Sequence, residues 1–256
     1  GGVHSNQEHI YAICKLAKQE GLENVFIHAF TDGRDCDPKS GLAFIEELQT
    51  ELDKSVGKIA SIVGPNGAGK STAMKAIFGL LDIRKGQIFL DGEDITNLRP
   101  QERVLKGMGF VPQTNNIFPS LSVQENLEMG AFIQAKNCED MLNYIYELFP
   151  ILKDKRHQQA GELSGGQRQQ VAVGRALMTN PKVLMLDEPS AGVSPIVMEG
   201  IFKKIKEIAN QGTAILMVEQ NAKQALAISD LGFVLNQGKN LFTDTGKSLL
   251  DNKEVR

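Results

Sequence analysis

The chain has 256 residues, 41% hydrophobic and 23% charged, which allows one large α/β domain or one domain with a small appendage. Its net charge of -3 argues against bulk electrostatic binding of nucleic acid, and no apolar run reaches the roughly eighteen residues of a membrane span. Three widely spaced cysteines, Cys14, Cys36 and Cys138, indicate free thiols in a reducing cytosol.

Residues 1–56 show an α/β pattern. Apolar residues at helical spacing predict helices over 6–20 and 38–54, and the apolar run NVFIHAF (24–30) predicts a strand between them. The opening GGVHSNQEHI has neither a basic n-region nor an apolar h-region, so we expect no signal peptide. It also lacks an initiator Met, which indicates a fragment.

The pattern from residue 57 onward predicts a parallel sheet covered by helices on both faces, because continuous apolar strands alternate with helices. The dipeptide DG within GQIFLDGEDI predicts a tight turn between two short strands. The other predicted strands are KIASIV (58–63), KVLMLDEP (182–189) and TAILMVEQ (213–220), and the predicted helices are STAMKAIFGLL (71–81) and PIVMEGIFKKIKEIANQG (195–212), which stops at Gly212.

The segment GPNGAGKS fits the phosphate-loop pattern G-x-x-x-x-G-K-[ST]. Its glycines let backbone N–H groups turn inward on the β-phosphate, and the following helix presents its positive N-terminal end to the same anion. Lys70 is expected to reach the β- and γ-phosphates, and Ser71 to place its hydroxyl on Mg²⁺. The predicted nucleotide-binding residues are Gly64, Pro65, Asn66, Gly67, Ala68, Gly69, Lys70, Ser71 and Thr72.

An acidic pair follows the apolar strand in VLMLDEPSAG. Asp187, at the carboxyl end of the strand, can hold Mg²⁺ through water, as phosphoryl-transfer enzymes require. Glu188 points into the same crevice, where it can polarise the attacking water. Together with the phosphate loop, this pair predicts a nucleotide hydrolase.

A second anion-binding helix terminus is predicted in LSGGQRQQVAVGRALMTNP, where Ser164 and two glycines open a helix. One chain does not need two such phosphate sites unless the second serves the nucleotide of another chain. The residues expected to act in trans are Leu163, Ser164, Gly165, Gly166 and Gln167.

With these motifs the chain, from about Gly57 to its end, resembles the ATP-binding subunit of ABC transporters. The resemblance rests on Walker A at 64–71, a Q-loop glutamine at Gln113 in GFVPQ, the signature LSGGQ, and Walker B with Glu188. The segments IFPSLSVQENLEMGAF, DEPSAGVSP and LMVEQNAKQALAISD look most like importers for branched-chain or other hydrophobic amino acids.

The resemblance implies a head-to-tail pair of ATPase subunits, identical or different, that sandwich two ATP molecules. It also implies membrane permease subunits, indirectly a solute-binding protein, no nucleic acid, and a cytoplasmic place at the inner face of the cell membrane. Implied catalytic residues are Glu188, Gln220 and Gln113, and implied Mg²⁺ ligands are Ser71, Gln113 and Asp187. Gln220 occupies the position of the family's switch histidine, and it can hydrogen-bond the γ-phosphate but cannot become an imidazolium.

The segment before the phosphate loop departs from this family. The antiparallel strands and the adenine-stacking aromatic residue that the family normally has before the loop have no counterpart here. Phe44 is nearest in spacing to that aromatic residue, but it lies in the predicted helix 38–54 and is interpreted as core. Residues 1 to about 63 instead resemble an internal piece of the cofactor-independent phosphoglycerate mutase, through GGVHS, EGLENVFIHAFTDGRD, PKSGLAFIEELQTEL and VGKIASIVG.

The mutase resemblance implies former phosphoglycerate contacts at His4, Arg34 and Asp35. The enzyme's serine nucleophile, metal ligands and other substrate arginines are missing from this chain, so mutase activity is not expected. We interpret the three residues as solvated surface positions. Because GKIASIVG fits both families without a linker, we infer a chimera, which leaves open a fusion, an engineered join or an assembly artefact.

The expected fold is an α/β P-loop core of the ABC ATPase type, with a helical signature subdomain at about 112–178 and a foreign βα segment in place of the antiparallel strands. The expected domains are 1–56 and 57–256. The first functional hypothesis is Mg-ATP hydrolysis that powers import of hydrophobic amino acids. The alternatives are a chimera that binds nucleotide without hydrolysing it, a fragment with mutase ancestry, and a soluble ATPase acting on ribosomes or DNA.

Overall fold

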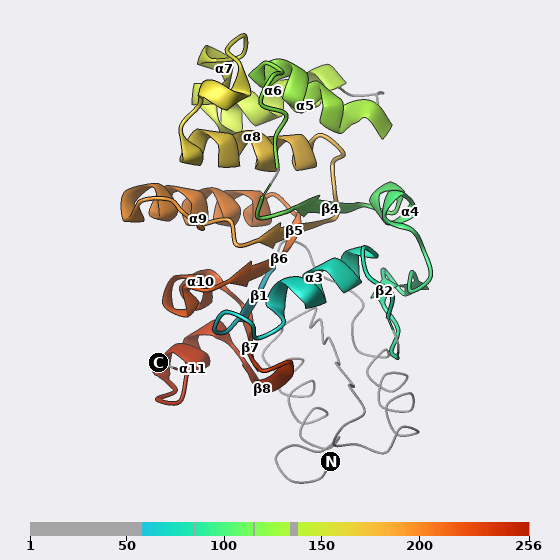
Figure 1. The fold of residues 1–256 in the computed structure, drawn as a ribbon, viewed down its shortest axis with the longest axis vertical. Coiled ribbons are helices and arrows are strands. Elements are labelled where there is room, and N and C mark those ends of the chain that lie inside the picture. The colour runs from blue at the N-terminus through green and yellow to red at the C-terminus, as the bar shows by residue number, and fades with distance from the viewer. Residues whose placement is uncertain (1–57, 84, 115, 134–137, 256) are drawn as a thin grey trace.

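A computed structural model describes residues 58–255 except 84, 115 and 134–137 (Figure 1). The predicted helices 6–20 and 38–54 and the strand at 24–30 lie outside the described residues. The same holds for Phe44 and for His4, Arg34 and Asp35. The proposed replacement of antiparallel strands by a foreign segment, and the boundaries of the two domains, therefore stay predictions.

The described chain is built on a six-stranded sheet of order β4-β5-β6-β1-β7-β8. The first five strands run parallel and β8 pairs antiparallel with β7 at the edge. Parallel neighbours therefore end at one common edge of the sheet, where the phosphate loop and the acidic pair begin. The strands are β1 Ile59–Val63, β4 Met108–Val111, β5 Val183–Asp187, β6 Ala214–Glu219, β7 Leu231–Asn236 and β8 Lys239–Asp244.

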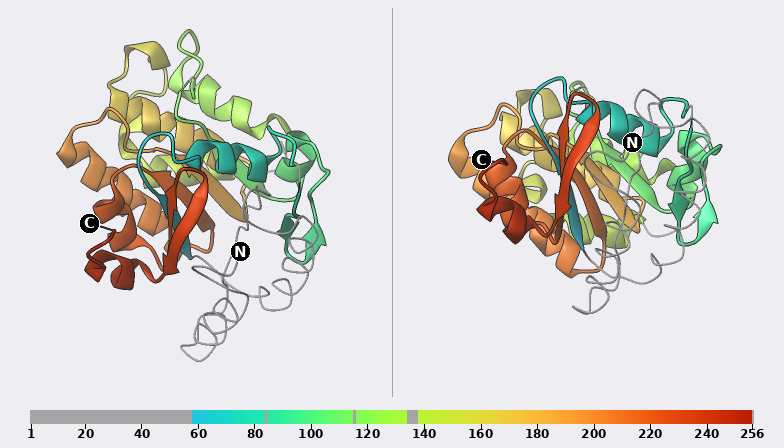
Figure 2. Two further views of the ribbon diagram at one scale, coloured as in Figure 1. Left: turned by 60° about the horizontal axis from the view of Figure 1, so that its bottom comes forward. Right: turned by 90° about the horizontal axis from the view of Figure 1, so that it is seen from below.

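Both faces of this sheet are covered, as the continuous apolar strands predicted. Alternate residues of β1 enter different cores: Ile62 packs on the side of α3 (Lys70–Phe78), and Val63 packs on the opposite side. Helices α9 (Pro195–Asn210) and α10 (Ala222–Ile228) contact the sheet on that second side. The two views of Figure 2 show the sheet between these layers.

A layer of helices follows β4 and returns to the sheet at β5, beyond α9 in Figure 1. Serine caps begin two of its helices, Ser122 at α5 and Ser164 at α8. Gly174 of α8 lets α5 and α6 approach closely, because a Cβ there would lie 2.9 Å from Leu127 and 3.0 Å from Ile145. The layer comprises α5 Val123–Gly130, the 3₁₀ turn Ala131–Ile133, α6 Cys138–Leu148, α7 Pro150–Asp154, the 3₁₀ turn Ala160–Glu162 and α8 Gly165–Leu177.

Two hairpins complete the fold, together with α4 (Pro100–Leu105) and α11 (Gly246–Asp251). The predicted DG turn joins β2 (Phe89–Leu90) to β3 (Glu93–Asp94), with Asp91 and Gly92 both at positive φ. The β7–β8 hairpin was not predicted; it turns at Gln237 and Gly238, also both at positive φ. Within the described residues, no helix has the length and apolar character to cross a membrane.

Candidate nucleotide-binding site

The phosphate loop connects β1 to α3 at the carboxyl edge of the sheet. Gly67 and Gly69 adopt φ of 80° and 94°, and Gly69 caps α3 in a left-handed conformation. Lys70 is 4% exposed, and its Nζ donates to the carbonyls of Gly64 at 2.9 Å and Pro65 at 3.1 Å. The loop therefore wraps around the ammonium group that was predicted to reach the phosphates.

The tip of the β7–β8 hairpin supports this loop from the other side. The Gly238 N–H donates to the Ala68 carbonyl at 3.0 Å. A Cβ on Gly64 would lie 2.1 Å from the Leu235 carbonyl oxygen, so only glycine allows the strand and loop to approach this closely. Glycine patterning predicted the loop, but nothing local in the sequence identified the hairpin as its neighbour.

The acidic pair after β5 meets the phosphate loop. Ser71 donates through Oγ to Asp187 Oδ1 at 2.8 Å, and Asp187 is only 3% exposed. Glu188 Oε1 lies 3.7 Å from Lys70 Nζ, and Glu188 Oε2 accepts from Gln113 Nε2 at 2.8 Å. Five residues predicted from three separate motifs thus lie together at one site.

The side chains around Ser71 suit a magnesium ion. Ser71 offers a hydroxyl and Asp187 a carboxylate, which are the hard oxygen ligands that Mg²⁺ prefers. Gln113 donates through its amide nitrogen to Glu188, and its amide oxygen is a further ligand of the same kind. Ser71, Asp187 and Gln113 would hold Mg²⁺, which when bound would neutralise charge on the phosphates.

The backbone at Glu188 is strained, since this non-glycine residue has φ of 50°. Such a conformation costs on the order of 1–3 kcal/mol and persists only where surrounding contacts hold it. One such contact is the Glu188 N–H, which donates to the Val218 carbonyl at 2.9 Å. Two residues that the motifs did not identify, Ser190 and Glu219, supply another.

Glu219 is the last residue of β6 and is 1% exposed. Its Oε1 accepts from the Ser190 N–H and its Oε2 from the Ser190 hydroxyl, each at 2.9 Å. The pKa of the Glu219 carboxyl is raised, mainly because the group is buried. The charge of Glu188 raises it further, whereas the two bonds from Ser190 lower it and offset part of the rise. In the sequence, the feature that could have identified Glu219 as a site residue is its place as an acidic residue at the end of the apolar run TAILMVE.

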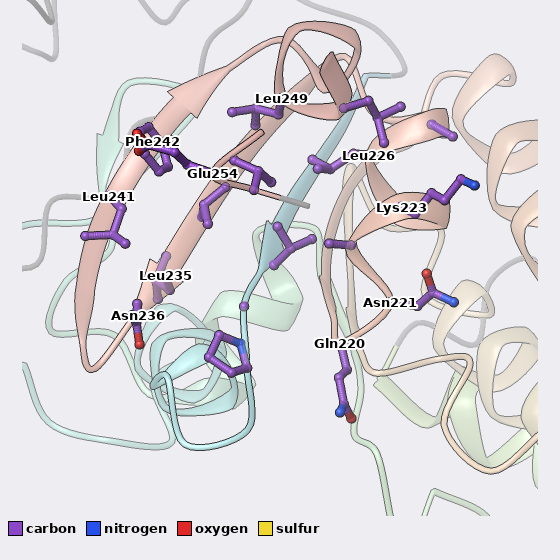
Figure 3. Close-up of a pocket in the computed structure, with 18 of the residues that line it drawn as sticks. Gln220, Asn221, Lys223, Leu226, Leu235, Asn236, Leu241, Phe242, Leu249 and Glu254 are labelled. Atoms are coloured by element: carbon purple, nitrogen blue, oxygen red, sulfur yellow. The ribbon is translucent and has the colours of Figure 1, made fainter. Parts of the chain in front are cut away.

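Gln220 follows Glu219 and is exposed at one end of a groove of about 1050 Å³ (Figure 3). Gly64 and Pro65 line the same groove, so Gln220 lies beside the start of the phosphate loop. The rest of it is lined by apolar side chains that include Leu226 and Leu249, and by polar ones that include Glu254. The position of Gln220 is compatible with a contact to a bound phosphate.

The signature residues form an open helix end. Ser164 caps α8 by accepting from the Gln167 N–H at 3.3 Å, while Leu163 is buried. No heavy atom lies within 4 Å of a Cβ built on Gly165, whereas one on Gly166 would lie 2.5 Å from Val197 of α9. The first turn of α8 is thus anchored on one side and accessible on the other.

These features define a P-loop nucleotide-binding protein with a helical layer inserted between two strands of its sheet. The family model described as "ABC transporter" matches residues 48–191, and the chain belongs to this family as an ATP-binding subunit with an ABC ATPase domain. A second model, described as "BPG-independent PGAM N-terminus", matches residues 1–68. Both resemblances predicted from the sequence are therefore confirmed, and the two matches overlap across GKIASIVG.

Curated relatives align with most of this chain. It is 40% identical to the "High-affinity branched-chain amino acid transport ATP-binding protein BraG" of Pseudomonas aeruginosa, over 83% of this chain and 91% of BraG. It is 35% identical to the "Lipopolysaccharide export system ATP-binding protein LptB" of Haemophilus influenzae, over 80% of this chain and 86% of LptB.

Solved structures agree with the fold. The ADP conformation of an ATP-binding cassette of an ABC transporter superposes with a TM-score of 0.69 at 32% identity, over 78% of this chain and 86% of that one. A dimeric cassette in a post-hydrolysis state, bound to ADP and Pi, gives 0.66 at 25% identity, over 76% and 88%. ATP hydrolysis is the activity that this family membership implies.

Proposed function

We propose that this chain hydrolyses Mg-ATP to power an ABC importer for branched-chain or other hydrophobic amino acids. The observation that carries the proposal is the convergence of Lys70, the Ser71–Asp187 pair and the Gln113–Glu188 pair at one edge of the sheet. A loop that encloses a cation and an oxygen-rich metal site are both needed to hold a nucleoside triphosphate.

Each side chain has a separate proposed role. Residues Gly64–Thr72 cradle the phosphates, with Lys70 on the β- and γ-phosphates. Ser71, Asp187 and Gln113 hold Mg²⁺. Glu188 polarises the attacking water, and Gln220 hydrogen-bonds the γ-phosphate. Binding of the triphosphate would separate Glu188 from Lys70, which lie 3.7 Å apart in this structure, and leave the carboxylate for the water.

The complete site is proposed to require a second ATPase subunit, either a copy of this chain or a different one. The partner's signature, equivalent to Leu163–Gln167, would cover the phosphates held by this chain's loop. The accessible first turn of α8 supports this arrangement, because its free N–H groups favour an anion. The dimeric relative supports it as well.

The class of transported substrate is proposed from similarity to relatives, because permease subunits and a solute-binding protein, and not this chain, would select the substrate. The 40% identity to a branched-chain amino acid transport protein exceeds the 35% identity to a lipopolysaccharide export protein. Attachment to a permease would place the chain at the inner face of the cell membrane.

We propose domains of 1–56 and 57–256, with the helical subdomain at about 112–178.

Calorimetry and turnover measurements test the proposal. We expect the full chain to bind Mg-ATP saturably, Lys70→Ala to lose that binding, and Glu188→Gln to keep binding while losing turnover. Glu162→Gln, exposed in the helical layer, is the matched control and should behave as the unaltered chain. Binding without turnover in the unaltered chain would favour the non-hydrolysing alternative. Unchanged turnover in Glu188→Gln would exclude the catalytic role of Glu188.

A further inference from the structure

The carboxylate of Glu219 joins two segments that reach the candidate site from different strands. It ends β6 and precedes Gln220, and it binds Ser190, two residues beyond Glu188. Ser190 is 6% exposed, so this contact is closed to solvent on both sides. A carboxylate that accepts two bonds from one residue fixes both the position and the orientation of that residue.

The turn that Glu219 holds is the strained one. The Ala191 N–H donates to the Glu188 carbonyl at 3.0 Å, which closes a turn through Pro189 and Ser190. Glu188 keeps its φ of 50° at the start of this turn. Because Ser190 is fixed to the end of β6, the turn cannot relax without breaking a buried, charge-assisted contact.

The same strand end also lies beside the phosphate loop. Glu219 pairs in register with Val63, the last residue of β1, and its neighbour Val218 pairs with Asp187. Glu219 thus occupies the midpoint between the loop that would hold the nucleotide and the turn that carries Glu188. No other side chain in the described hydrogen bonds links β6 to the turn at Ser190.

We propose that Glu219 is a positioning residue for hydrolysis. Its carboxylate holds Ser190, and through Ser190 the backbone of Glu188, at a fixed place relative to Gln220 and the phosphate loop. This inference rests on the proposed catalytic role of Glu188. Glu219 would touch neither nucleotide nor water, so its loss should slow turnover without weakening nucleotide binding.

Substitutions that keep size but alter hydrogen bonding test this role. Glu219→Leu keeps a side chain of similar size, but it has no atom that can accept a bond from the Ser190 N–H or hydroxyl. We expect kcat to fall about 10- to 100-fold, because small displacements of a catalytic group have effects of that size. The Kd for Mg-ATP should stay within about twofold of the unaltered chain. Glu219→Asp, which keeps the carboxylate acceptor, should retain more turnover than Glu219→Leu.

A double-mutant cycle separates positioning from general damage. Ser190→Ala should reduce kcat in the unaltered chain, but should add less than about a twofold loss in the Glu219→Leu background, because the contact is already broken there. Glu207→Gln is the matched control: Glu207 pairs with Lys204 on α9 and should leave kcat unchanged. Thermal unfolding of each variant identifies any that fail to fold.

Two results would overturn the inference while the proposed function stands, provided that Glu188→Gln is inactive. One is kcat within twofold of the unaltered chain in a folded Glu219→Leu variant. The other is an equal loss of ATP binding and turnover, which would show a purely structural role. Full turnover in Glu188→Gln would instead overturn the proposed function itself, and with it this inference.

Discussion

Glycines in this chain differ in whether a larger residue could replace them, and the space around each Cβ position shows which could be replaced. Gly64 has φ of 156°, and a Cβ there would lie 2.1 Å from the Leu235 carbonyl oxygen. Gly200 lies within α9, and nothing approaches its Cβ position within 4 Å. The phosphate-loop pattern marks Gly64 in the sequence, but only the structure shows that the packing of the loop against β7 requires it.

We therefore predict that Gly64→Ala lowers the free energy of unfolding by roughly 2 kcal/mol or more, because backbone must move to admit the methyl group. Gly200→Ala should raise it by about 0.5–1 kcal/mol, since alanine has the higher helix propensity. Urea denaturation of the two variants measures both changes. Equal stability of the two would contradict the close approach of Leu235 to the loop.

At the scale of elements, Arg103 of α4 joins the helix that follows the phosphate loop to the chain around the β2–β3 hairpin. Its side chain is 1% exposed and donates to the carbonyls of Ala76 and Ile77, which end α3. It also donates to the carbonyls of Thr96 and Leu98. Burial lowers the pKa of Arg103, and its positive charge complements the C-terminal end of α3.

Replacing Arg103 with Met should cost roughly 2–4 kcal/mol of folding stability, because the carbonyls that it satisfies would be left buried without a donor. The matched control is Arg99→Met, since the side chain of Arg99 is 78% exposed and should contribute less than about 0.5 kcal/mol. Thermal and urea unfolding compare the two. Similar small effects in both would show that α3 does not depend on this contact.

At the scale of the whole molecule, the phosphate loop and the first turn of α8 belong to different layers, and we propose that each forms half of a nucleotide site. At the edge of the sheet, Lys70 Nζ lies 3.7 Å from Glu188 Oε1, and Ser71 Oγ donates to Asp187 Oδ1 at 2.8 Å. The hydrogen bonds described for the Ser164 backbone and hydroxyl stay within the first turn of α8. This arrangement favours a dimer in which each signature serves the other chain's nucleotide.

We predict that the Glu188→Gln variant forms a dimer when Mg-ATP is present, and that adding Gly165→Arg abolishes the dimer but not ATP binding by the monomer. Gly165 has open space at its Cβ position, so arginine is tolerated in the isolated fold and obstructs only a partner. Glu139→Arg, exposed on α6, provides the control for added positive charge. Size-exclusion chromatography with and without ATP measures the outcome. A dimer that persists with Gly165→Arg would exclude the signature as the interface.

Local chemistry explains how much of the site the sequence could predict. The phosphate loop, the strand-end acidic pair and the serine cap of α8 depend on residues close together in the chain. Their glycine φ values, strand ends and cap are found where expected. The catalytic, metal-binding and trans-acting roles assigned to them stay predictions. The family assignment needed only these motifs, the glutamine Gln113 and their spacing.

Contacts between distant segments had no comparable local signal. The support of Ala68 by Gly238, the closeness of Gly64 to Leu235 and the bond between Ser190 and Glu219 each join residues separated by long stretches of chain. The strand order β5-β6-β1-β7 brings them together. The sequence alone thus determined which chemistry this protein carries. The tertiary structure decided how that chemistry is held in place, because strand order, and not distance along the chain, sets which side chains meet.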